Sequence, residues 1–249
     1  MVKNKVILVT GGAGGIGSAI CKKFADEGAR VIITYNSNAE KAESLKKELK
    51  GKGHAIFHAP TTDADKIKTL SEFVATQYGK LDILVNNAGI TTPVAHNNLE
   101  GLTDEWIDKI MQTNVRGTFA MIRSFKDLLE AASKDEASLV VNISSVAAIT
   151  GIGSNVAYCA SKAAVDNITR SLARALAPKI RVVSVSPGWV LGEYAKTFDP
   201  SYIKMQEDLT PLGRLASPED VANTVYALAT QLTFTTGSII PVDGGRPLR

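Results

Sequence analysis

Residues 5–17, "KVILVTGGAGGIG", decide the fold class of this chain. Their first half is a short aliphatic and β-branched run, which predicts a buried strand. The second half is rich in glycine and fits the spacing G-x-G-x-x-G from Gly12 to Gly17, and also the spacing G-x-x-x-G-x-G from Gly11 to Gly17. Glycines at either spacing let the backbone turn tightly and approach a pyrophosphate, which the free N–H groups of the following helix attract. A strand, a glycine turn and a helix in this order indicate a dinucleotide-binding βαβ unit.

Six further apolar runs alternate with longer segments of helical period; they lie at residues 30–35, 54–59, 81–89, 138–145, 180–188 and 237–245. Runs that are apolar at nearly every position suit a parallel sheet that is covered by helices on both faces. The sequence has no linker, repeat or low-complexity tract that would divide it. We therefore predict an α/β fold, a single doubly wound Rossmann-type domain over residues 1–249 with a parallel sheet of about seven strands flanked by helices.

The composition is that of a globular protein, with 45% hydrophobic residues and a formal net charge of +3. This charge is too small and too dispersed for a nucleic-acid-binding surface, and no apolar run approaches the roughly 20 residues of a membrane-spanning helix. Cys21 and Cys159 have no CxxC spacing, so we expect buried free thiols and predict a cytoplasmic protein without nucleic-acid or membrane partners. His54, His58 and His96 show no ligand spacing. We therefore predict no metal site and interpret His54 and His58 as strand residues.

Tyr158 is the only one of the six tyrosines that has a lysine, Lys162, four residues later. Residues at this spacing meet on any helix, so the pair alone does not decide its role. Transfer of a hydride between a nicotinamide and a carbonyl carbon requires a proton to move to or from the carbonyl oxygen. A phenol has a pKa of about 10 and is a poor base at neutral pH, but a cation held close to it lowers that pKa. The pair therefore has the residue types of an acid/base group and its activating charge.

Several motifs follow one another along the chain: Thr10-Gly11-x-x-x-Gly15-x-Gly17, "NNAG" at residues 86–89, Asn114, Ser145, Tyr158-x-x-x-Lys162, "SPG" at residues 186–188 and "VDGG" at residues 242–245. Taken together and in this order, they resemble the short-chain dehydrogenase/reductase family, and within it the 3-oxoacyl-(acyl-carrier-protein) reductases. The likeness extends along the whole chain. It implies a nicotinamide-dependent oxidoreductase that interconverts a ketone and a secondary alcohol, with Tyr158 as the general acid/base.

The resemblance also implies roles for the other catalytic candidates. Ser145 would hydrogen-bond the substrate oxygen, Lys162 would contact the nicotinamide ribose, and Asn114 would help to hold a water-linked proton path. Ser144 is the competing serine, and its offset of 14 residues from Tyr158 makes it the second choice. In the doubly wound fold, ligands lie beyond the carboxyl ends of the strands. We expect the glycine turn, "NNAG", Ser145 and the Pro-Gly pair to share that edge of the sheet.

The predicted cofactor contacts are Gly11, Gly14, Gly15, Ile16, Gly17, Asn36, Ser37, Asn87, Ala88, Gly89, Tyr158, Lys162, Pro187, Gly188 and Val190. No acidic residue occurs between Arg30 and Glu40, where a carboxylate would bind the ribose 2′-hydroxyl and repel a 2′-phosphate. We therefore predict that NADP(H) is favoured over NAD(H). Two positions depart from the family pattern. Pro60 stands where many relatives have an aspartate beside the adenine, with Asp63 a little later, and the segment after Gly188 lacks the threonine that binds the nicotinamide amide.

Three stretches are expected to wall the substrate pocket: residues 90–101, residues 147–157 and a segment without a clean pattern at about residues 189–217, which we interpret as a lid. They are mostly apolar or small, which favours a weakly polar carbonyl substrate. Trp189 in the lid segment is expected either to reach the nicotinamide or substrate or to pack within the lid. The resemblance further implies a homotetramer built on the last helix and strand and on residues 104–132 and 156–177.

Three alternatives remain open from the sequence. A 3-oxoacyl thioester reductase would dock an acidic carrier protein on a basic surface, whereas the loop at residues 132–138, expected near the catalytic edge, carries Asp135 and Glu136. A nucleotide-sensing protein without turnover would keep the fold, but the intact set of Ser145, Tyr158 and Lys162 argues against it. An epimerase or dehydratase is disfavoured by the modest chain length.

Overall fold

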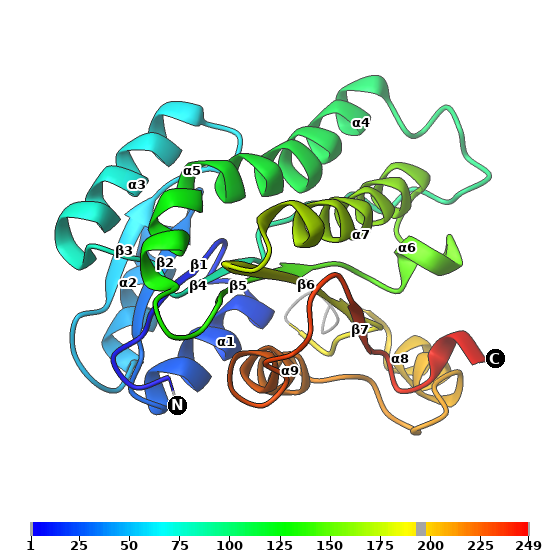
Figure 1. The fold of residues 1–249 in the computed structure, drawn as a ribbon. Helices are drawn as coiled ribbons and strands as arrows, with labels where there is room; N and C mark the ends of the chain where they lie inside the picture. The colour runs from blue at the N-terminus through cyan, green and yellow to red at the C-terminus, as the bar shows by residue number, and fades with distance from the viewer. Residues whose placement is uncertain (1, 193–197, 249) are drawn as a thin grey trace.

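The computed structural model describes residues 2–192 and 198–248, and a seven-stranded sheet runs through the middle of the molecule (Figure 1). The strand order is β3-β2-β1-β4-β5-β6-β7, and every neighbouring pair is parallel. The strands are β1 (Val6–Val9), β2 (Arg30–Tyr35), β3 (Ala55–His58), β4 (Ile83–Asn86), β5 (Ser138–Ile143), β6 (Ile180–Pro187) and β7 (Ile239–Val242). All seven predicted runs form strands, so the predicted doubly wound fold is confirmed.

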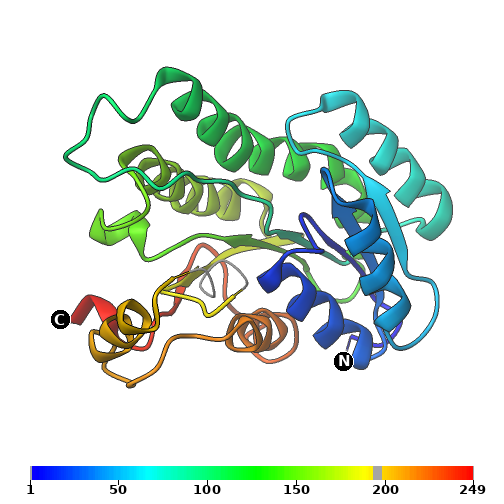
Figure 2. The same cartoon turned by 180° about the vertical axis from the view of Figure 1, so that it is seen from behind.

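Helices cover both faces of the sheet (Figures 1 and 2). One face carries α1 (Gly15–Asp26), α2 (Ala39–Glu48) and α9 (Pro218–Thr230). The other carries α3 (Ala64–Tyr78), α5 (Thr118–Ala132) and α7 (Val156–Leu176). The remaining helical elements are α4 (Asp104–Ile110), the π-helix η1 (Met111–Gly117), α6 (Ala147–Thr150), α8 (Pro200–Asp208) and the 3₁₀ turn η3 (Arg246–Leu248). Each face buries its own hydrophobic core against the sheet, and this explains why the strands are apolar at nearly every position.

The strand order reverses at β1, which has β2 on one side and β4 on the other. In a parallel sheet the connections that leave β1 and β4 turn to opposite faces, so a crevice forms beyond the carboxyl ends of these two strands. The glycine turn follows β1 and "NNAG" follows β4, and both therefore lie at this crevice.

Helix starts are fixed by polar residues that the sequence places just before each apolar stripe. Asn38, Asp63 and Asn155 each accept a hydrogen bond from a backbone N–H of the first turn of α2, α3 and α7. Ser217 and Asp220 form a capping box at the start of α9. Asp63 is thus held as the N-cap of α3 by a bond from the Lys66 N–H at 3.0 Å.

Helix α8 is a feature that the sequence did not reveal, because it lies in the segment interpreted as lacking a pattern. It begins with Asp199 as N-cap and Pro200 in the first turn, and Gln206 is its one buried residue. A nine-residue helix without an apolar stripe gives no period to detect. Part of the predicted lid, residues 193–197, lies outside the described residues.

Cys21 and Cys159 are free and buried, as expected, and burial raises the pKa of both thiols. His58 ends β3, whereas His54 stands just before that strand and accepts a bond from the Val31 N–H. Among residues 2–192 and 198–248, no helix is long and apolar enough to span a membrane. The same residues contain no cluster of metal-ligating side chains.

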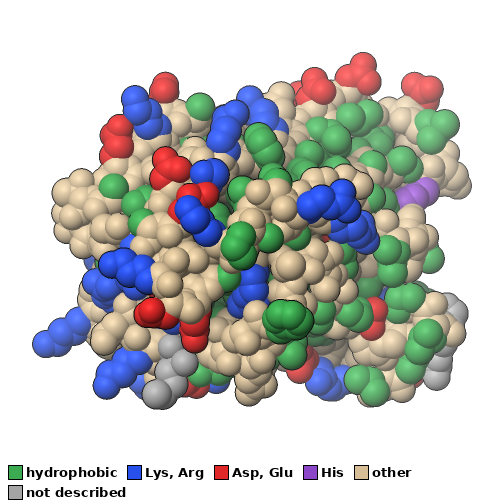
Figure 3. Space-filling view, viewed as in Figure 1, with side chains coloured by type: hydrophobic (Ala, Val, Ile, Leu, Met, Phe, Trp, Pro, Cys, Tyr) green, Lys and Arg blue, Asp and Glu red, His purple; other side chains and the backbone are tan. Residues whose placement is uncertain are grey.

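Hydrophobic side chains gather on the surface over α4 and α7 (Figure 3). Met111 on η1, Phe119 on α5 and Val156 on α7 are all exposed. Helix α7 also packs against η1 and α4, so these elements form one continuous face. Exposed apolar patches of this kind often mark surfaces that associate with another molecule.

Candidate functional site

The turn after β1 is shaped to hold a phosphate group. Gly11 has φ of 59°, and a Cβ at Gly17 would lie 2.6 Å from the Gly11 carbonyl oxygen, so neither position accommodates another residue without a shift. The N-cap residue of α1 is Gly14, which has no side chain that could accept a bond from the first N–H groups of the helix. The first turn also contains no acidic residue. Among the described residues, the first N–H groups of α1, at Gly15, Ile16 and Gly17, therefore have no side-chain cap. Uncapped N–H groups and the positive end of the helix dipole fit the pyrophosphate of a dinucleotide.

The segment after β4 holds this glycine turn in place. The Thr10 hydroxyl accepts bonds from the N–H groups of Asn87 and Ala88, both at 2.9 Å. The Asn87 side-chain amide donates to the carbonyls of Thr10 at 2.9 Å and Gly11 at 3.1 Å. Asn87, predicted as a cofactor contact, thus uses its amide hydrogens to fix the cofactor-binding turn.

The residues after β2 lie beside the same turn. Thr34 connects them to it, since the Gly12 N–H donates to the Thr34 carbonyl at 3.1 Å. Asn36 and Ser37 are exposed, and the Asn38 side-chain oxygen is used to cap α2. Asn36 and Ser37 therefore have side chains open to solvent at the place where the ribose 2′ position is expected.

Tyr158 stands in the first turn of α7, and two residues set its position. Asn155 caps the helix by accepting a 2.7 Å bond from the Tyr158 N–H. At the other end of the side chain, the Ser145 hydroxyl lies close enough to the phenol to act on its pKa. Burial raises the pKa of the Tyr158 phenol above its usual value, and the Ser145 hydroxyl acts in the opposite direction. A raised pKa favours the protonated phenol, which is the form that can donate a proton to a carbonyl oxygen.

The two candidate serines point to different places. Ser145 meets Tyr158, and its oxygen also accepts a 3.2 Å bond from the Ala147 N–H. Ser144 is buried and directs its hydroxyl toward α7, with the Lys162 carbonyl 3.4 Å away. The structure thus brings Ser145, the first choice from the sequence, to the phenol.

Lys162 is almost fully buried, with 6% of its surface exposed. Its ammonium donates to the Ile143 carbonyl at 2.7 Å and lies 5.7 Å from the centre of the Tyr158 ring. Burial lowers the pKa of Lys162 to about 8, and the charge of Asp166 opposes that shift. The sequence suggested that this cation would lower the pKa of the phenol; in the folded chain burial has the largest effect, and the pKa of Tyr158 is raised.

Asn114 lies within the π-helix η1 and is buried. Its side-chain oxygen accepts from the Ile90 N–H at 2.8 Å, and its amide donates to the Ile90 carbonyl and to the Ser161 hydroxyl, both at 3.0 Å. A Cβ at Gly89 would meet the Asn114 oxygen at 3.3 Å and the Lys162 nitrogen at 3.6 Å. Asn114, Gly89 and Lys162 therefore converge on one point, and the bulge of a π-helix is a common feature of functional sites.

The Pro-Gly segment after β6 closes the site on the side of β7. The Gly188 N–H donates to the Val242 carbonyl at 3.0 Å, and a Cβ at Gly188 would lie 3.0 Å from the Asp243 Cα. Val190 pairs with Ala216 across the base of the predicted lid. Trp189 packs against the rings of Phe198 and Tyr202, with centroids 5.4 and 5.7 Å away. Of the two expectations for Trp189, these contacts correspond to packing within the lid segment.

An apolar cavity of about 180 Å³ lies between two of the predicted pocket walls. The walls are joined by bonds from the Val94 N–H to the Ser154 carbonyl at 2.9 Å and from the Asn155 amide to the Thr92 carbonyl at 2.7 Å. The residues that line the cavity are Val94, Ala95, His96, Asn98, Leu99, Leu102, Ile107, Asn155 and Val156. Asn155, one of the lining residues, also caps the turn that carries Tyr158.

Comparison with known proteins agrees with this geometry. A family model described as enoyl-(acyl carrier protein) reductase matches residues 11–246. A 3-oxoacyl-[acyl-carrier-protein] reductase FabG from Staphylococcus aureus is 35% identical over 249 residues, which cover 98% of this chain and 99% of that protein. A 3alpha-hydroxysteroid dehydrogenase from Mediterraneibacter gnavus is 34% identical over 252 residues, which cover 98% and 97% of the two chains. The chain belongs to the short-chain dehydrogenase/reductase family. It is therefore an oxidoreductase.

Solved structures of the short-chain dehydrogenase/reductase family have the same fold. A putative member from Burkholderia xenovorans superposes with a TM-score of 0.91 at 30% identity, and the match covers 100% of both chains. The Pseudomonas aeruginosa RhlG/NADP active-site complex superposes with a TM-score of 0.89 at 31% identity, with coverage of 98% and 97%. The sequence-based assignment to this family is thus confirmed.

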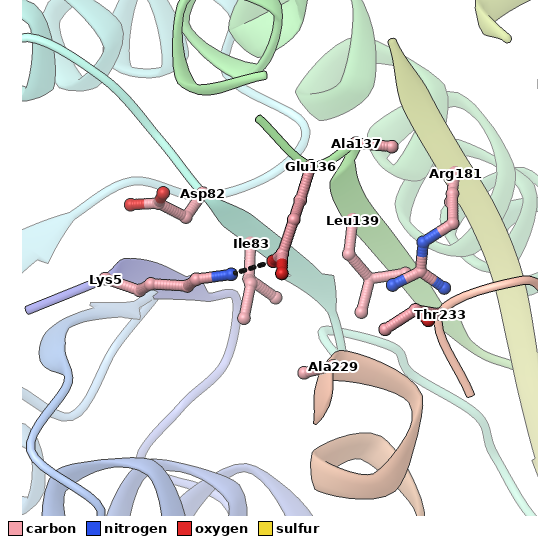
Figure 4. Close-up of a pocket in the computed structure, with 9 residues that line it drawn as sticks. All are labelled: Lys5, Asp82, Ile83, Glu136, Ala137, Leu139, Arg181, Ala229 and Thr233. Carbon is pink, nitrogen blue, oxygen red and sulfur yellow. Dashed lines mark hydrogen bonds and ion pairs between the residues drawn. The ribbon is translucent and has the colours of Figure 1, made fainter. Parts of the chain in front are cut away.

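One expectation about the short-chain dehydrogenase site is wrong. The loop at residues 132–138, with Asp135 and Glu136, lies at the amino edge of the sheet, because it leads into β5. Figure 4 shows Glu136 facing Lys5, which precedes β1, across a cavity of about 190 Å³, and their charged groups are 3.0 Å apart. Arg181 borders the same cavity and donates to carbonyls at the end of α9. The acidic loop is thus at the opposite edge from Tyr158 and does not weigh against a carrier-protein substrate.

Sequence reasoning missed several residues that support the site. Thr10 holds the "NNAG" segment, Asn155 caps the turn of Tyr158, and Ser161 joins Asn114 to α7 through its bond to the Tyr158 carbonyl. Asn155 carried a signal, since an asparagine three residues before the bonded N–H is a common N-cap. Asp166 is buried one turn after Lys162, but its place in the sequence carried no signal of this, because an acid within an amphipathic helix usually faces solvent.

Proposed function

We propose that this enzyme reduces a ketone to a secondary alcohol in the cell, with Ser145, Tyr158, Lys162 and Asn114 as its catalytic set. The observation that carries the proposal is the contact of the Tyr158 phenol with Ser145, one helical turn from the buried Lys162 ammonium. These groups adjoin the uncapped N-terminus of α1 through the segment after β4. Proton donor, oxygen-binding hydroxyl and cofactor cradle thus share one edge of the sheet.

Each of these groups has a separate role in binding or proton transfer. The glycine turn and the first N–H groups of α1 hold the pyrophosphate, and the Lys162 ammonium, which has donors left beyond its bond to Ile143, binds the nicotinamide ribose. A bound nicotinamide supplies the hydride. The Ser145 hydroxyl binds the carbonyl oxygen, and Tyr158 donates the proton that this oxygen needs as it becomes an alkoxide. Asn114 keeps Ile90 and Ser161 in place and supports the path by which Tyr158 is reprotonated.

We infer NADP(H) as the preferred cofactor. Asn36 and Ser37 offer neutral, exposed side chains at the end of β2, and no carboxylate stands between Arg30 and Glu40 to repel a 2′-phosphate. The proposed cofactor contacts are those predicted from the sequence, with one refinement: Asn87 acts by holding the turn rather than through its amide hydrogens.

The substrate class follows from the apolar cavity beside Asn155, which suits an aliphatic or alicyclic group next to the carbonyl. A 3-oxoacyl thioester is the second candidate, supported by the likeness to the FabG protein and by the position of the acidic loop at the far edge. We further propose that residues 1–249 act as one catalytic domain, that residues 189–217 close over the substrate, and that the enzyme is a cytoplasmic homotetramer.

The test follows the absorbance of reduced nicotinamide with a panel of ketones and 3-oxoacyl thioesters and both cofactors. We expect turnover by the wild type and a loss of about 10²–10⁴-fold in Tyr158→Phe, because only the proton-donating hydroxyl is removed. Tyr78→Phe is the matched control, since Tyr78 donates its hydroxyl hydrogen to Gly53 before β3, at the amino edge, and should keep wild-type turnover. Wild-type rates in Tyr158→Phe would refute the assignment.

A further inference from the structure

A row of buried polar side chains crosses the sheet just before its carboxyl edge. Asn86, Asn142 and Ser184 are register partners on β4, β5 and β6. The Asn86 amide donates to Asn142 at 2.9 Å, the Asn142 amide donates to the Thr169 hydroxyl at 2.9 Å, and Thr169 and Ser184 are 2.7 Å apart. The row thus runs from the middle of the sheet to α7.

Asp166 stands where this row meets the catalytic turn. It is 3% exposed, and the hydroxyls of Ser184 and of Ser144, the neighbour of Ser145, lie close enough to favour its ionised form. One of its oxygens has no hydrogen-bond partner among residues 2–192 and 198–248. A buried carboxylate that is only partly satisfied destabilises a fold unless a charge compensates for it. This acid is therefore poorly explained by stability alone.

The charged groups around Asp166 are few. On α7 itself, Lys162 lies one turn before it and the exposed Arg170 one turn after it, and both act on its carboxylate. Of the elements packed against α7, β5 and α6 have no titratable side chain, and β6 has Arg181, at the opposite edge. The η1 residue Arg116 donates to the Thr62 carbonyl.

The helix α4 also packs against α7, and its charged side chains, Asp104, Glu105, Asp108 and Lys109, are exposed. Besides Asp166, the titratable groups within one turn of Lys162 on α7 are Tyr158 and Cys159, neither of which is charged when protonated. Asp166 is thus the acid that acts on Lys162.

We propose that Asp166 is a positioning residue of this site, whose buried carboxylate is the counter-charge that keeps Lys162 protonated. The inference rests on the proposed function, in which the Lys162 ammonium binds the ribose and faces the phenol. The Ser144 hydroxyl, next to Ser145, also lies near this carboxylate.

The reason is electrostatic. Within the described part of the chain, the Lys162 ammonium makes one hydrogen bond, to the Ile143 carbonyl, and burial lowers its pKa to about 8 even with Asp166 present. Without the carboxylate this pKa would fall further, toward the pH at which the enzyme works. A neutral Lys162 would lose its attraction for a phenolate and would offer one hydrogen fewer to the ribose.

The titration of Lys162 tests the inference directly, by NMR of isotope-labelled lysine in the full-length protein, with the signal assigned by its loss in Lys162→Met. We expect Asp166→Asn to lower the Lys162 pKa by about one unit, because a neighbouring opposite charge is lost. Thr169→Val is the matched control: it breaks the same polar row on the same helix but removes no charge, and should leave the Lys162 pKa unchanged. An unchanged pKa in Asp166→Asn overturns the inference.

If Asp166→Asn fails to fold, a second variant tests the same inference. Ser184→Ala removes a hydroxyl that favours the ionised form of Asp166, so it should lower the Lys162 pKa as well, by a smaller amount. In kinetics, the alkaline limb of kcat/KM for reduction should move to lower pH in Asp166→Asn and not in Thr169→Val. A shifted Lys162 pKa with an unmoved limb would refute the positioning role. Absence of turnover in the wild type would refute the proposed function alone, because the titration needs no substrate.

Discussion

Replacement of Lys162 by methionine should stabilise the cofactor-free protein near neutral pH, although it should also remove activity. Methionine has a similar length and no charge, so it fits the buried site without desolvation of an ammonium. Lys162 is 6% exposed, and burial lowers its pKa from 10.5 to about 8. The ammonium is thus held in the folded chain against the preference of its surroundings.

The magnitude follows from the two pKa values. One pKa unit corresponds to about 1.4 kcal/mol. At neutral pH the charge on Lys162 therefore destabilises the folded state by about 3 kcal/mol. Methionine removes this term but leaves the Ile143 carbonyl without its donor, which costs about 1 kcal/mol. The net expectation is a gain of about 2 kcal/mol in the free energy of unfolding near neutral pH.

The pH dependence identifies the source. Between pH 8 and 10.5 the unfolded chain binds a proton on Lys162 that the folded chain does not, so the stability of the wild type rises with pH in this window. The advantage of Lys162→Met should therefore shrink and then reverse to about −1 kcal/mol above the window, where only the lost hydrogen bond remains.

Urea unfolding at a series of pH values and fixed protein concentration measures this difference. Lys68→Met is the control, since the Lys68 side chain is 77% exposed and its removal should change stability by no more than about 0.5 kcal/mol at any pH. A Lys162→Met variant that is less stable than the wild type at neutral pH, or a difference that does not vary with pH, would refute the reasoning.

The other predictions concern the oxygen-binding group, the cofactor and assembly. Ser145→Ala should lower kcat by about 10²–10³-fold with little effect on cofactor affinity, because it removes a donor to the developing oxyanion; steady-state kinetics and a cofactor titration separate the two. Ser37→Asp should shift the ratio of kcat/KM values toward NAD(H), through repulsion of the 2′-phosphate, and an unchanged ratio would mean that another residue reads the ribose. Light scattering at micromolar concentration should give a tetramer, and Phe119→Lys, which places a charge in the exposed apolar face of α5, should weaken it.

Much of the fold was predictable because a parallel sheet covered on both faces leaves its pattern in the sequence. Each strand is apolar at nearly every position, and the glycine turn shows where the first one ends. Helix α8 was not predictable, because it is short and buries one residue, Gln206. The acidic loop at residues 132–138 was misplaced, although its position just before the run 138–145 puts it at the amino edge of a parallel sheet.

The candidate site was likewise predictable only in part. Ser145, Tyr158 and Lys162 could be predicted as a group because the family resemblance gives their residue types and spacings, and the structure brings them close together. Asp166 could not, because its effect depends on burial, and burial results from the packing of α7 on β5 and β6. Local sequence records propensity and periodicity, whereas desolvation of a charge is a property of the folded chain.

Helix α7 shows how stability and function are separated within one element. The first part of its buried face is polar, with Ser161, Lys162, Asp166 and Thr169, and lies against the ends of β5 and β6. The last part is apolar, and Ala173 belongs to the core that also contains β6 residues. Burial of a charged group is a weak way to stabilise a helix, and well-packed apolar residues in its place often stabilise more. The polar part is therefore retained for the groups that it holds at the catalytic edge, while the apolar part anchors the helix against the sheet.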